Sequence, residues 1–207
     1  MRTTPTRAER RQATRRDLLD AAEKLFNERG FAATSLDVLA DAAGYTKGAV
    51  YSNFDCKEDV FFSVYERRVE RFLADVERAA AESQDGARTA DEVMAGVIAR
   101  REGGDGWLAV FLEFWTHVLR HPEHRERFAE IHVRVIDSAA ARIRQFAADR
   151  QIELPIDARQ LAIGTFALGN GLGLERLTAP DIVEPDLALQ MQRLLRASLL
   201  AQTEGGS

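Results

Sequence analysis

The chain has 207 residues, of which 45% are hydrophobic, enough for one large helical domain or for a small domain joined to a larger one. Its formal net charge of -5 at pH 7 argues against a protein that coats nucleic acid indiscriminately. No apolar run is long enough to span a membrane, and the single cysteine excludes an internal disulfide. We therefore expect a cytoplasmic protein without a membrane partner.

The charges are unevenly distributed along the chain. Residues 1–16 contain six arginines but one acidic residue, Glu9, and the acidic excess lies entirely after residue 60. A basic N-terminal arm on an otherwise acidic chain allows a local anion-binding surface. A disordered, solubilising tail is the alternative for residues 1–8.

Apolar residues recur at helical spacing from end to end and strand signals are nearly absent, so the predicted fold class is all-α. A loop that starts at residue 82 interrupts this pattern, and the sequence GGDG at 103–106 is the strongest loop signal in the chain. The expected helices cover about residues 14–29, 35–43, 46–54 and 56–81, a weaker helix ending near 102, and then 107–121, 122–146, 158–178 and 187–202.

The first three helices are short, with a glycine between the second and the third, which is the layout of a helix-turn-helix motif. At about 100° per residue, Val50 and Phe54 share the inward face of the third helix, whereas Gly48 and Ser52 point the opposite way. Small outward residues allow the backbone to approach a major groove about 12 Å wide. A helix-turn-helix used only for packing is the alternative.

Phosphate-binding groups flank the third helix. Thr46 can cap its N-terminus, where Lys47 lies beside free backbone N–H groups. Tyr51 offers a hydroxyl suited to a backbone phosphate, and Lys57 repeats the arrangement of Lys47 at the start of the next helix.

The segment TSLDVLADAAGYTKGAVYSNFDCKEDVF, residues 34–61, resembles the helix-turn-helix of the TetR family of transcriptional regulators. The resemblance is dense over residues 14–65 and elsewhere extends only to the helix-rich layout. It implies a DNA-binding domain over residues 1–60, a ligand-binding and dimerisation domain over residues 61–207, and a homodimer that a small molecule releases from a partly palindromic double-stranded operator. The DNA-binding residues it implies, mostly at phosphates and with Ser52 where base contacts often arise, are Ser35, Tyr45, Thr46, Lys47, Gly48, Tyr51, Ser52, Asn53 and Lys57.

Two residues depart from the family pattern. Asn53 replaces a frequent histidine but can still donate a hydrogen bond to DNA. Cys56 replaces the usual helix-capping serine, and Asp55 can take over the cap. A thiol at a helix N-terminus can have a lowered pKa and respond to oxidants, whereas a lone, partly buried cysteine is more often inert.

An aromatic group after residue 106 can either pack a core or line an effector pocket. His132 and Asn170 fall on apolar stripes, where a neighbouring side chain or a bound ligand must satisfy them. The absence of a cluster of cations favours a mostly apolar effector. The expected pocket residues are Trp107, Phe111, Phe114, Trp115, His132, Phe166 and Asn170.

A glycine-rich helix at 161–177 has two apolar faces, so one face can meet a partner helix closely. A tight internal core is the alternative. The expected dimer-interface residues are Leu168, Leu172, Met191, Leu194 and Leu195.

Glu113, His117 and His121 follow an i, i+4, i+8 spacing that permits zinc binding, and His124 could join from the next helix. Because exposed histidines are ordinary at a helix corner such as Pro122, no metal site is expected. No catalytic motif or cofactor-binding motif is found, so an enzyme is an improbable alternative. A DNA-binding protein that needs no effector is the stronger rival to a ligand-released repressor.

Overall fold

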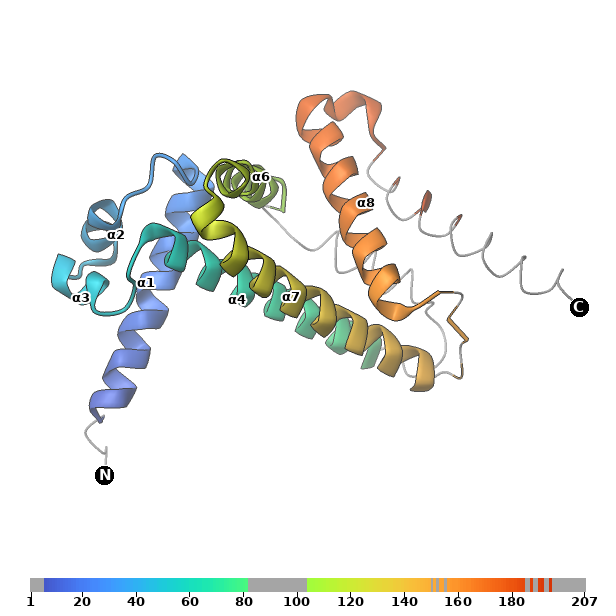
Figure 1. The fold of residues 1–207 in the computed structure, drawn as a ribbon, viewed down its shortest axis with the longest axis horizontal. Coiled ribbons are helices and arrows are strands. Elements are labelled where there is room, and N and C mark those ends of the chain that lie inside the picture. Colours follow the sequence, from blue (N-terminus) through green and yellow to red (C-terminus); the bar gives the residue numbers. More distant parts are fainter. Residues whose placement is uncertain are drawn as a thin grey trace, which may run out of the picture. The chain divides into compact units, whose positions relative to one another are not determined.

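The computed structural model describes residues 6–81, 104–149, 151, 153, 154, 156–184, 187, 190, 191 and 194. All regular elements within these residues are helical, which confirms the predicted all-α class (Figure 1). None of the described helices is long and apolar enough to cross a membrane. The elements are α1 (Arg7–Arg29), α2 (Leu36–Ala43), α3 (Lys47–Tyr51), α4 (Lys57–Ala81), α6 (Gly104–Arg120), α7 (Pro122–Asp149), α8 (Ala158–Thr178) and the 3-10 turn η1 (Pro180–Ile182).

The ends of the first two helices follow from their capping residues. Helix α1 begins at Arg7, earlier than predicted, because Thr6 and Glu9 form a reciprocal capping box with N–H to oxygen distances of 3.2 and 2.6 Å. Helix α2 begins after Ser35, whose hydroxyl accepts the N–H of Val38, and ends at Gly44 in the left-handed conformation. Both ends of α2 were predicted correctly.

Helix α3 is shorter than predicted, with five residues, but its orientation is as expected. Val50 and Phe54 are 0% and 3% exposed, and both pack into the core. The two residues anchor a helix that is too short to be stable alone, so tertiary packing rather than helix propensity holds it.

The chain divides into two compact units, which we call the head (residues 1–68 and 109–128) and the body (residues 69–108 and 129–207). The head thus contains most of α6 and the start of α7, which lie well beyond the predicted domain boundary at residue 60. Helices α4, α6 and α7 each contribute residues to both units.

The head is built around a cluster of aromatic rings. Phe61 of α4 and Phe114 of α6 stack with their ring centroids 3.7 Å apart, and Phe31 meets Phe114 edge-on at 4.9 Å. Such pairs add about 0.5–1.5 kcal/mol each to the free energy gained by burial. The buried aromatic residues of the cluster are Phe26, Phe31, Phe61, Phe62, Tyr65, Phe111, Phe114 and Phe128.

The body has a smaller described core between α7 and α8. Its buried residues are Ile136, Ala140, Ala158 and Ala162, and the partly buried residues Ala139, Ile143, Leu154 and Phe166 pack against them. Ion pairs reinforce the helix contacts, with Arg159 Nε 2.8 Å from Asp137 Oδ1 and Arg142 Nε 2.5 Å from Glu77 Oε1. These pairs are partly exposed, so each adds little to stability.

Candidate DNA-binding surface

The outward side of α3 is exposed to solvent and carries mostly small side chains. Gly48 and Ser52 are exposed, and Tyr51 at their flank is 54% exposed. A Cβ atom added at Gly48 would find Thr46 Oγ1 at 3.9 Å as its nearest neighbour outside the helix backbone, which is ordinary contact. The fold therefore does not require glycine at position 48.

Two arginines of α1 hold the C-terminal end of α3. Arg15 donates to the carbonyl oxygen of Asn53 at 2.8 Å and to Ser63 Oγ at 2.8 Å, and Arg11 donates to the carbonyl oxygen of Ser52 at 3.2 Å. The guanidinium of Arg15 also lies 4.4 Å from the ring centroid of Phe54. Sequence reasoning did not assign these contacts, although the i, i+4 spacing of the two arginines was a usable signal.

Two predicted DNA-binding side chains are paired with acids of the head. Lys47 Nζ lies 2.6 Å from Asp37 Oδ2, and Asp37 raises the pKa of Lys47 through this hydrogen bond. Tyr45 donates its hydroxyl to Asp17 Oδ2 at 2.7 Å, which raises the pKa of Tyr45. The Lys47 pair is exposed on both sides, so a phosphate can compete with the carboxylate.

Lys57, for which the sequence predicted a phosphate contact, is half-buried and binds backbone groups of the head. Its ammonium donates to the carbonyl oxygens of Phe31 and Ala32 at 2.9 and 3.3 Å and lies 4.1 Å from the Phe31 ring centroid. Burial lowers the pKa of Lys57, with Glu58 and Glu113 acting in the opposite direction. Local spacing could not reveal this role, because the acceptors lie 25 and 26 residues away.

Glu113 completes this arrangement from α6. Its carboxylate accepts the backbone N–H groups of Phe31 and Ala32 at 2.7 and 2.8 Å, so Lys57 and Glu113 bind the carbonyls and the N–H groups of the same two residues. Gly30, directly before them, has φ +80, a conformation that favours glycine. We call this arrangement the turn clamp.

The remaining predicted residues of the motif have local roles. Ser35 and Thr46 are exposed N-caps of α2 and α3. Asn53 donates to the carbonyl oxygen of Ala49 at 2.8 Å and is half-buried. Of the two alternatives for Cys56, the lowered thiol pKa is wrong, because burial raises the pKa of this thiol to about 11.

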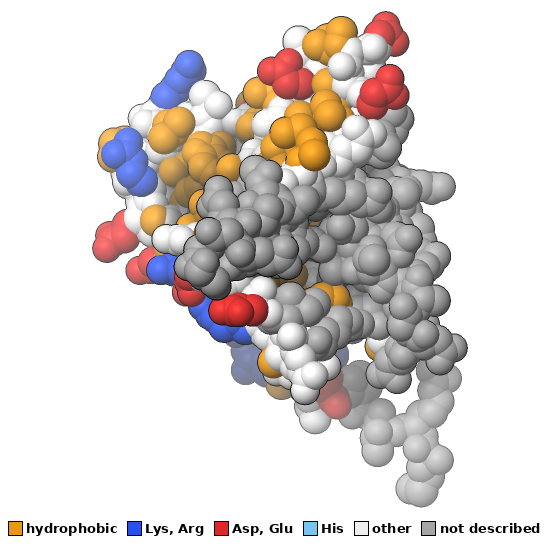
Figure 2. Space-filling model, turned by 90° about the vertical axis from the view of Figure 1, so that its right-hand side faces the viewer, with side chains coloured by type: hydrophobic (Ala, Val, Ile, Leu, Met, Phe, Trp, Pro, Cys, Tyr) orange, Lys and Arg blue, Asp and Glu red, His pale blue; other side chains and the backbone are white. Residues whose placement is uncertain are grey.

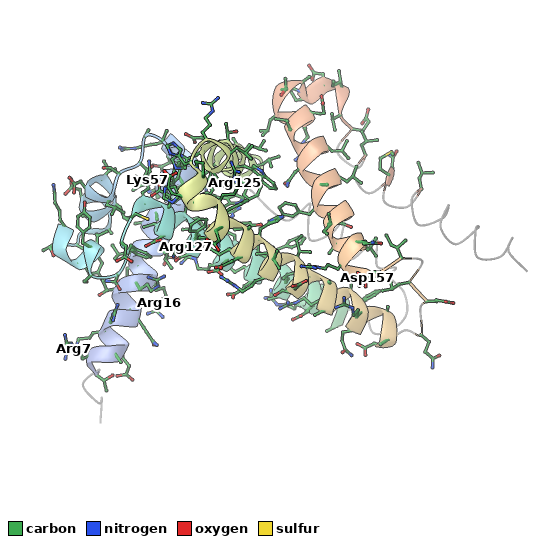
Figure 3. The ribbon with its side chains drawn as sticks, in the orientation of Figure 1. Arg7, Arg16, Lys57, Arg125, Arg127 and Asp157 are labelled. Carbon is green, nitrogen blue, oxygen red and sulfur yellow. The ribbon has the colours of Figure 1, made fainter. Side chains whose placement is uncertain are left out.

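Exposed cations line the N-terminal half of α1. Arg7, Arg10, Arg11 and Arg16 are all exposed, and Figure 3 shows Arg7 and Arg16 projecting from this helix. Together with Lys47 they give the head a set of positive side chains that phosphates can contact.

The predicted pocket residues fall into two groups. Phe111 and Phe114 are 2% and 0% exposed in the aromatic core of the head, and Trp115 packs edge-on against Phe128 there with ring centroids 5.3 Å apart. The second group, Trp107, His132, Phe166 and Asn170, is half-buried in the body. In that group the rings of His132 and Phe166 meet edge-on at 5.0 Å, and burial lowers the pKa of His132.

The glycine-rich helix α8 exposes several large apolar side chains. Ile163, Leu174 and Leu177 are 50%, 47% and 39% exposed, whereas the predicted interface residues Leu168 and Leu172 are half-buried. Figure 2 shows apolar side chains beside acidic ones at the upper end of the molecule, where α8 and η1 lie in Figure 1. Of the other predicted interface residues, Met191 is half-buried, Leu194 is 61% exposed and Leu195 lies outside the described residues.

The short helices α2 and α3, held on α1 with a small outward surface, define a protein of the helix-turn-helix class. Comparison with protein families gives the same result. Residues 18–64 match the model of bacterial regulatory proteins of the tetR family, and residues 87–201 match the C-terminal domain of BetI-type transcriptional repressors. The chain belongs to the TetR family of transcriptional regulators.

Curated relatives resemble this chain to different extents. The transcriptional regulator AcrR of Shigella flexneri is 46% identical over 55 residues, which cover 27% of this chain and 26% of AcrR. The transcriptional repressor AcnR of Corynebacterium efficiens is 27% identical over 155 residues, which cover 73% of this chain and 77% of AcnR. The match to AcrR thus spans about a quarter of that relative's length.

Solved structures share the fold over most of the chain. A transcriptional regulator of Rhodococcus has a TM-score of 0.67 at 21% identity, with 89% of this chain and 96% of that chain covered. The Thermus thermophilus repressor FadR, in complex with lauroyl-CoA, has a TM-score of 0.62 at 20% identity, covering 90% and 93%. A Saccharomonospora viridis protein in complex with choline has a TM-score of 0.59 at 22% identity, covering 87% and 93%.

Proposed function

We propose that the chain is a homodimeric transcriptional repressor that binds a partly palindromic operator and leaves it when a small, mostly apolar effector binds. The observation that carries this proposal is the geometry of α3, where Val50 and Phe54 are buried and Gly48 and Ser52 face outward. A helix with this arrangement presents its backbone to the floor of a major groove.

The groups around α3 supply the phosphate contacts of the proposed complex. Lys47, Tyr51 and Ser52 are exposed, and the arginines of α1 extend the positive surface beside them. Phosphate contacts fix the register of the head on DNA, whereas Ser52 and the backbone near Gly48 are placed to meet base edges. Lys57 acts in this proposal by holding the turn clamp and not by contacting phosphate.

Dimerisation is proposed through α8. Its exposed apolar residues Ile163 and Leu174 lie about 20° apart around the helix axis. Gly164 and Gly171 lie on the same side of the helix, beyond Ala167 around its circumference. A Cβ at either glycine would have no neighbour within 4 Å among the described residues, which leaves room there for a partner helix in this proposal. Two-fold packing of this face would present two heads to successive half-sites of an operator.

The effector is proposed to bind in the body beside His132, Phe166 and Asn170. These residues combine aromatic and polar groups from α7 and α8, as small-molecule sites usually do. Two proteins of this fold are in complex with small molecules, one with choline and one with lauroyl-CoA, which supports a small-molecule effector for this chain. Repression is relieved if the effector favours a conformation in which the two heads no longer match the operator, and a preference of about 2 to 3 kcal/mol is enough.

The proposal is tested by selecting bound fragments from a genomic DNA library with the full chain and measuring affinity for the enriched fragment by fluorescence anisotropy. We expect a fragment with two related half-sites, and we expect disruption of either half-site to lower the affinity strongly. Absence of any enriched fragment, or equal affinity for a single half-site, would contradict the proposal. Genes beside the fragment then suggest compounds to test for release.

The same measurement separates the two rivals. A DNA-binding protein without an effector would bind the fragment but would be released by none of the compounds related to the neighbouring genes. An enzyme with the same head would turn over a compound without a change in DNA affinity. The catalogued relatives named above are regulators, which favours regulation over catalysis.

A further inference from the structure

Two histidines and a glutamate from three helices of the head converge at the start of α4. Glu58 lies in the first turn of α4, His117 in the last turn of α6 and His124 near the start of α7. Nε2 of His117 lies 3.2 Å from Glu58 Oε1, and Nε2 of His124 lies 3.9 Å from the same oxygen. One ligand atom from each of the three residues lies within 4.8 Å of the other two.

These separations fit a single bound cation. Zinc in proteins has Zn–N and Zn–O distances of about 2.0–2.2 Å, so neighbouring ligand atoms of a tetrahedral site lie roughly 3.3–3.6 Å apart. The observed 3.2 and 3.9 Å lie on either side of this range, and the third pair of ligand atoms lies within 4.8 Å. Two imidazoles and one carboxylate are also a donor set that zinc accepts, with a position left for water.

The imidazole of His117 has a nitrogen atom that is available to bind a cation. Its Nε2 atom is buried and has no hydrogen-bond partner of acceptable geometry within the described part of the chain, although Glu58 is close. A buried polar atom without a hydrogen bond is uncommon in native proteins, and a bound ion is one explanation for it.

The surroundings fix the orientation of the His117 ring. It lies 5.2 Å from the ring of Phe31 and 5.9 Å from that of Phe114, and it stacks on His121 at 4.2 Å between centroids. A ligand held by packing loses little freedom when a metal binds. His121 itself lies 3.1 Å from Glu123, so it has a carboxylate partner outside the three-residue group.

We propose that Glu58, His117 and His124 form a binding site for a divalent first-row transition metal, with Zn²⁺ as the best match. The sequence spacing groups the histidines with Glu113, and the sequence alone predicted no metal site, because exposed histidines are ordinary at a helix corner. The structure assigns Glu113 to the backbone of Phe31 and Ala32, and Glu58 takes its place from another helix. The ion joins α4, α6 and α7 within the head, next to Lys57 of the turn clamp, and thereby stabilises the head.

The test is a titration of the full, untagged chain with Zn²⁺ in competition with a zinc-indicator dye, together with thermal unfolding with and without Zn²⁺. We expect one ion per chain and a rise of the melting temperature with Zn²⁺. Glu58→Gln and His124→Gln should each weaken binding by at least about tenfold and remove most of that rise. His132→Gln, which removes the chain's remaining histidine outside the corner at 117–124, should bind Zn²⁺ like the wild type.

Folding and adventitious binding are controlled separately. Both ligand variants should melt without Zn²⁺ within a few degrees of the wild type, because both side chains are partly exposed. Cys56→Ser tests whether the thiol supplies the binding instead. The proposal is overturned if Zn²⁺ binds the ligand variants as tightly as the wild type, or if Cys56→Ser alone abolishes binding. DNA is absent from these measurements, so their outcome is independent of the proposed operator binding.

Discussion

Lys47 and Lys57 occupy equivalent sequence positions at the starts of two helices, yet the structure gives them different roles. Lys47 is exposed and shares a surface ion pair with Asp37. Lys57 is half-buried, donates to the carbonyl oxygens of Phe31 and Ala32, and has its ammonium over the Phe31 ring. A sequence pattern that treats both as phosphate ligands therefore holds for at most one of them in this conformation.

Substitution of the two lysines should separate these roles. Lys47→Ala should weaken binding to all DNA sequences similarly and reduce the salt slope by about 1, with unchanged stability, because it removes one phosphate contact. Lys57→Met should keep that slope but lower the free energy of unfolding by about 1 to 2 kcal/mol, because it leaves two carbonyls without a charged donor. Anisotropy titrations at several salt concentrations and urea unfolding measure both quantities. An unchanged slope in Lys47→Ala would exclude its phosphate role.

At the scale of single elements, local sequence signals correctly predicted both ends of α2 and the buried face of α3. Helix α2 begins after Ser35 and ends at Gly44, as expected. The helical spacing also correctly predicted that Val50 and Phe54 are buried. The early start of α1 was missed because the capping box of Thr6 and Glu9 was not recognised.

Roles that depend on distant partners could not be predicted from the sequence. Glu113 binds residues 81 and 82 positions away, and Glu58 meets His117 from another helix. Local periodicity contains no information on such pairs, since it fixes only which face of its own helix a residue occupies. The same reason explains why the sequence left open whether Phe111 and Phe114 line a ligand pocket or pack a core.

Helix α8 offers a prediction about assembly. Gly171→Leu should leave the protomer intact, because a Cβ there meets no atom of the described residues within 4 Å, but should weaken the dimer by holding the partner helix away. Ile163→Glu should have the same effect by placing a charge in an apolar contact. Sedimentation velocity over a range of concentrations measures the dimer constant, and both variants should also lose operator affinity.

The matched control for this face is an exposed position on another helix. Ala141→Leu adds a comparable apolar side chain to the exposed part of α7 and should leave the dimer constant unchanged. If Gly171→Leu and Ile163→Glu both remain as dimeric as the wild type, α8 is not the interface.

On the scale of the whole molecule, the described residues of each unit form a core of their own. The aromatic rings of α6 belong to the core of the head, where they support the helix-turn-helix. His132 and Phe166 belong to the body. Effector binding and head stability should therefore respond to different substitutions.

Two phenylalanine truncations test this separation. Phe114→Ala should lower the free energy of unfolding by about 3–5 kcal/mol, because it opens a cavity among buried rings. Phe166→Ala, at a half-buried site, should destabilise less, retain operator affinity and change the affinity for an effector measured by calorimetry. If Phe166→Ala, His132→Ala and Asn170→Ala all bind a true effector like the wild type, the effector site lies elsewhere.

The most direct test of DNA recognition by α3 is the operator affinity of Gly48→Leu. The structure has room for the side chain, and leucine favours a helix over glycine by up to about 1 kcal/mol, so the variant should melt no lower than the wild type. Its bulk points outward into the space that a major groove would fill, and operator affinity should fall by at least about 100-fold, or about 2.7 kcal/mol. Ala141→Leu should bind the operator like the wild type. A folded, dimeric Gly48→Leu protein with undiminished operator affinity would contradict DNA recognition by this face of α3.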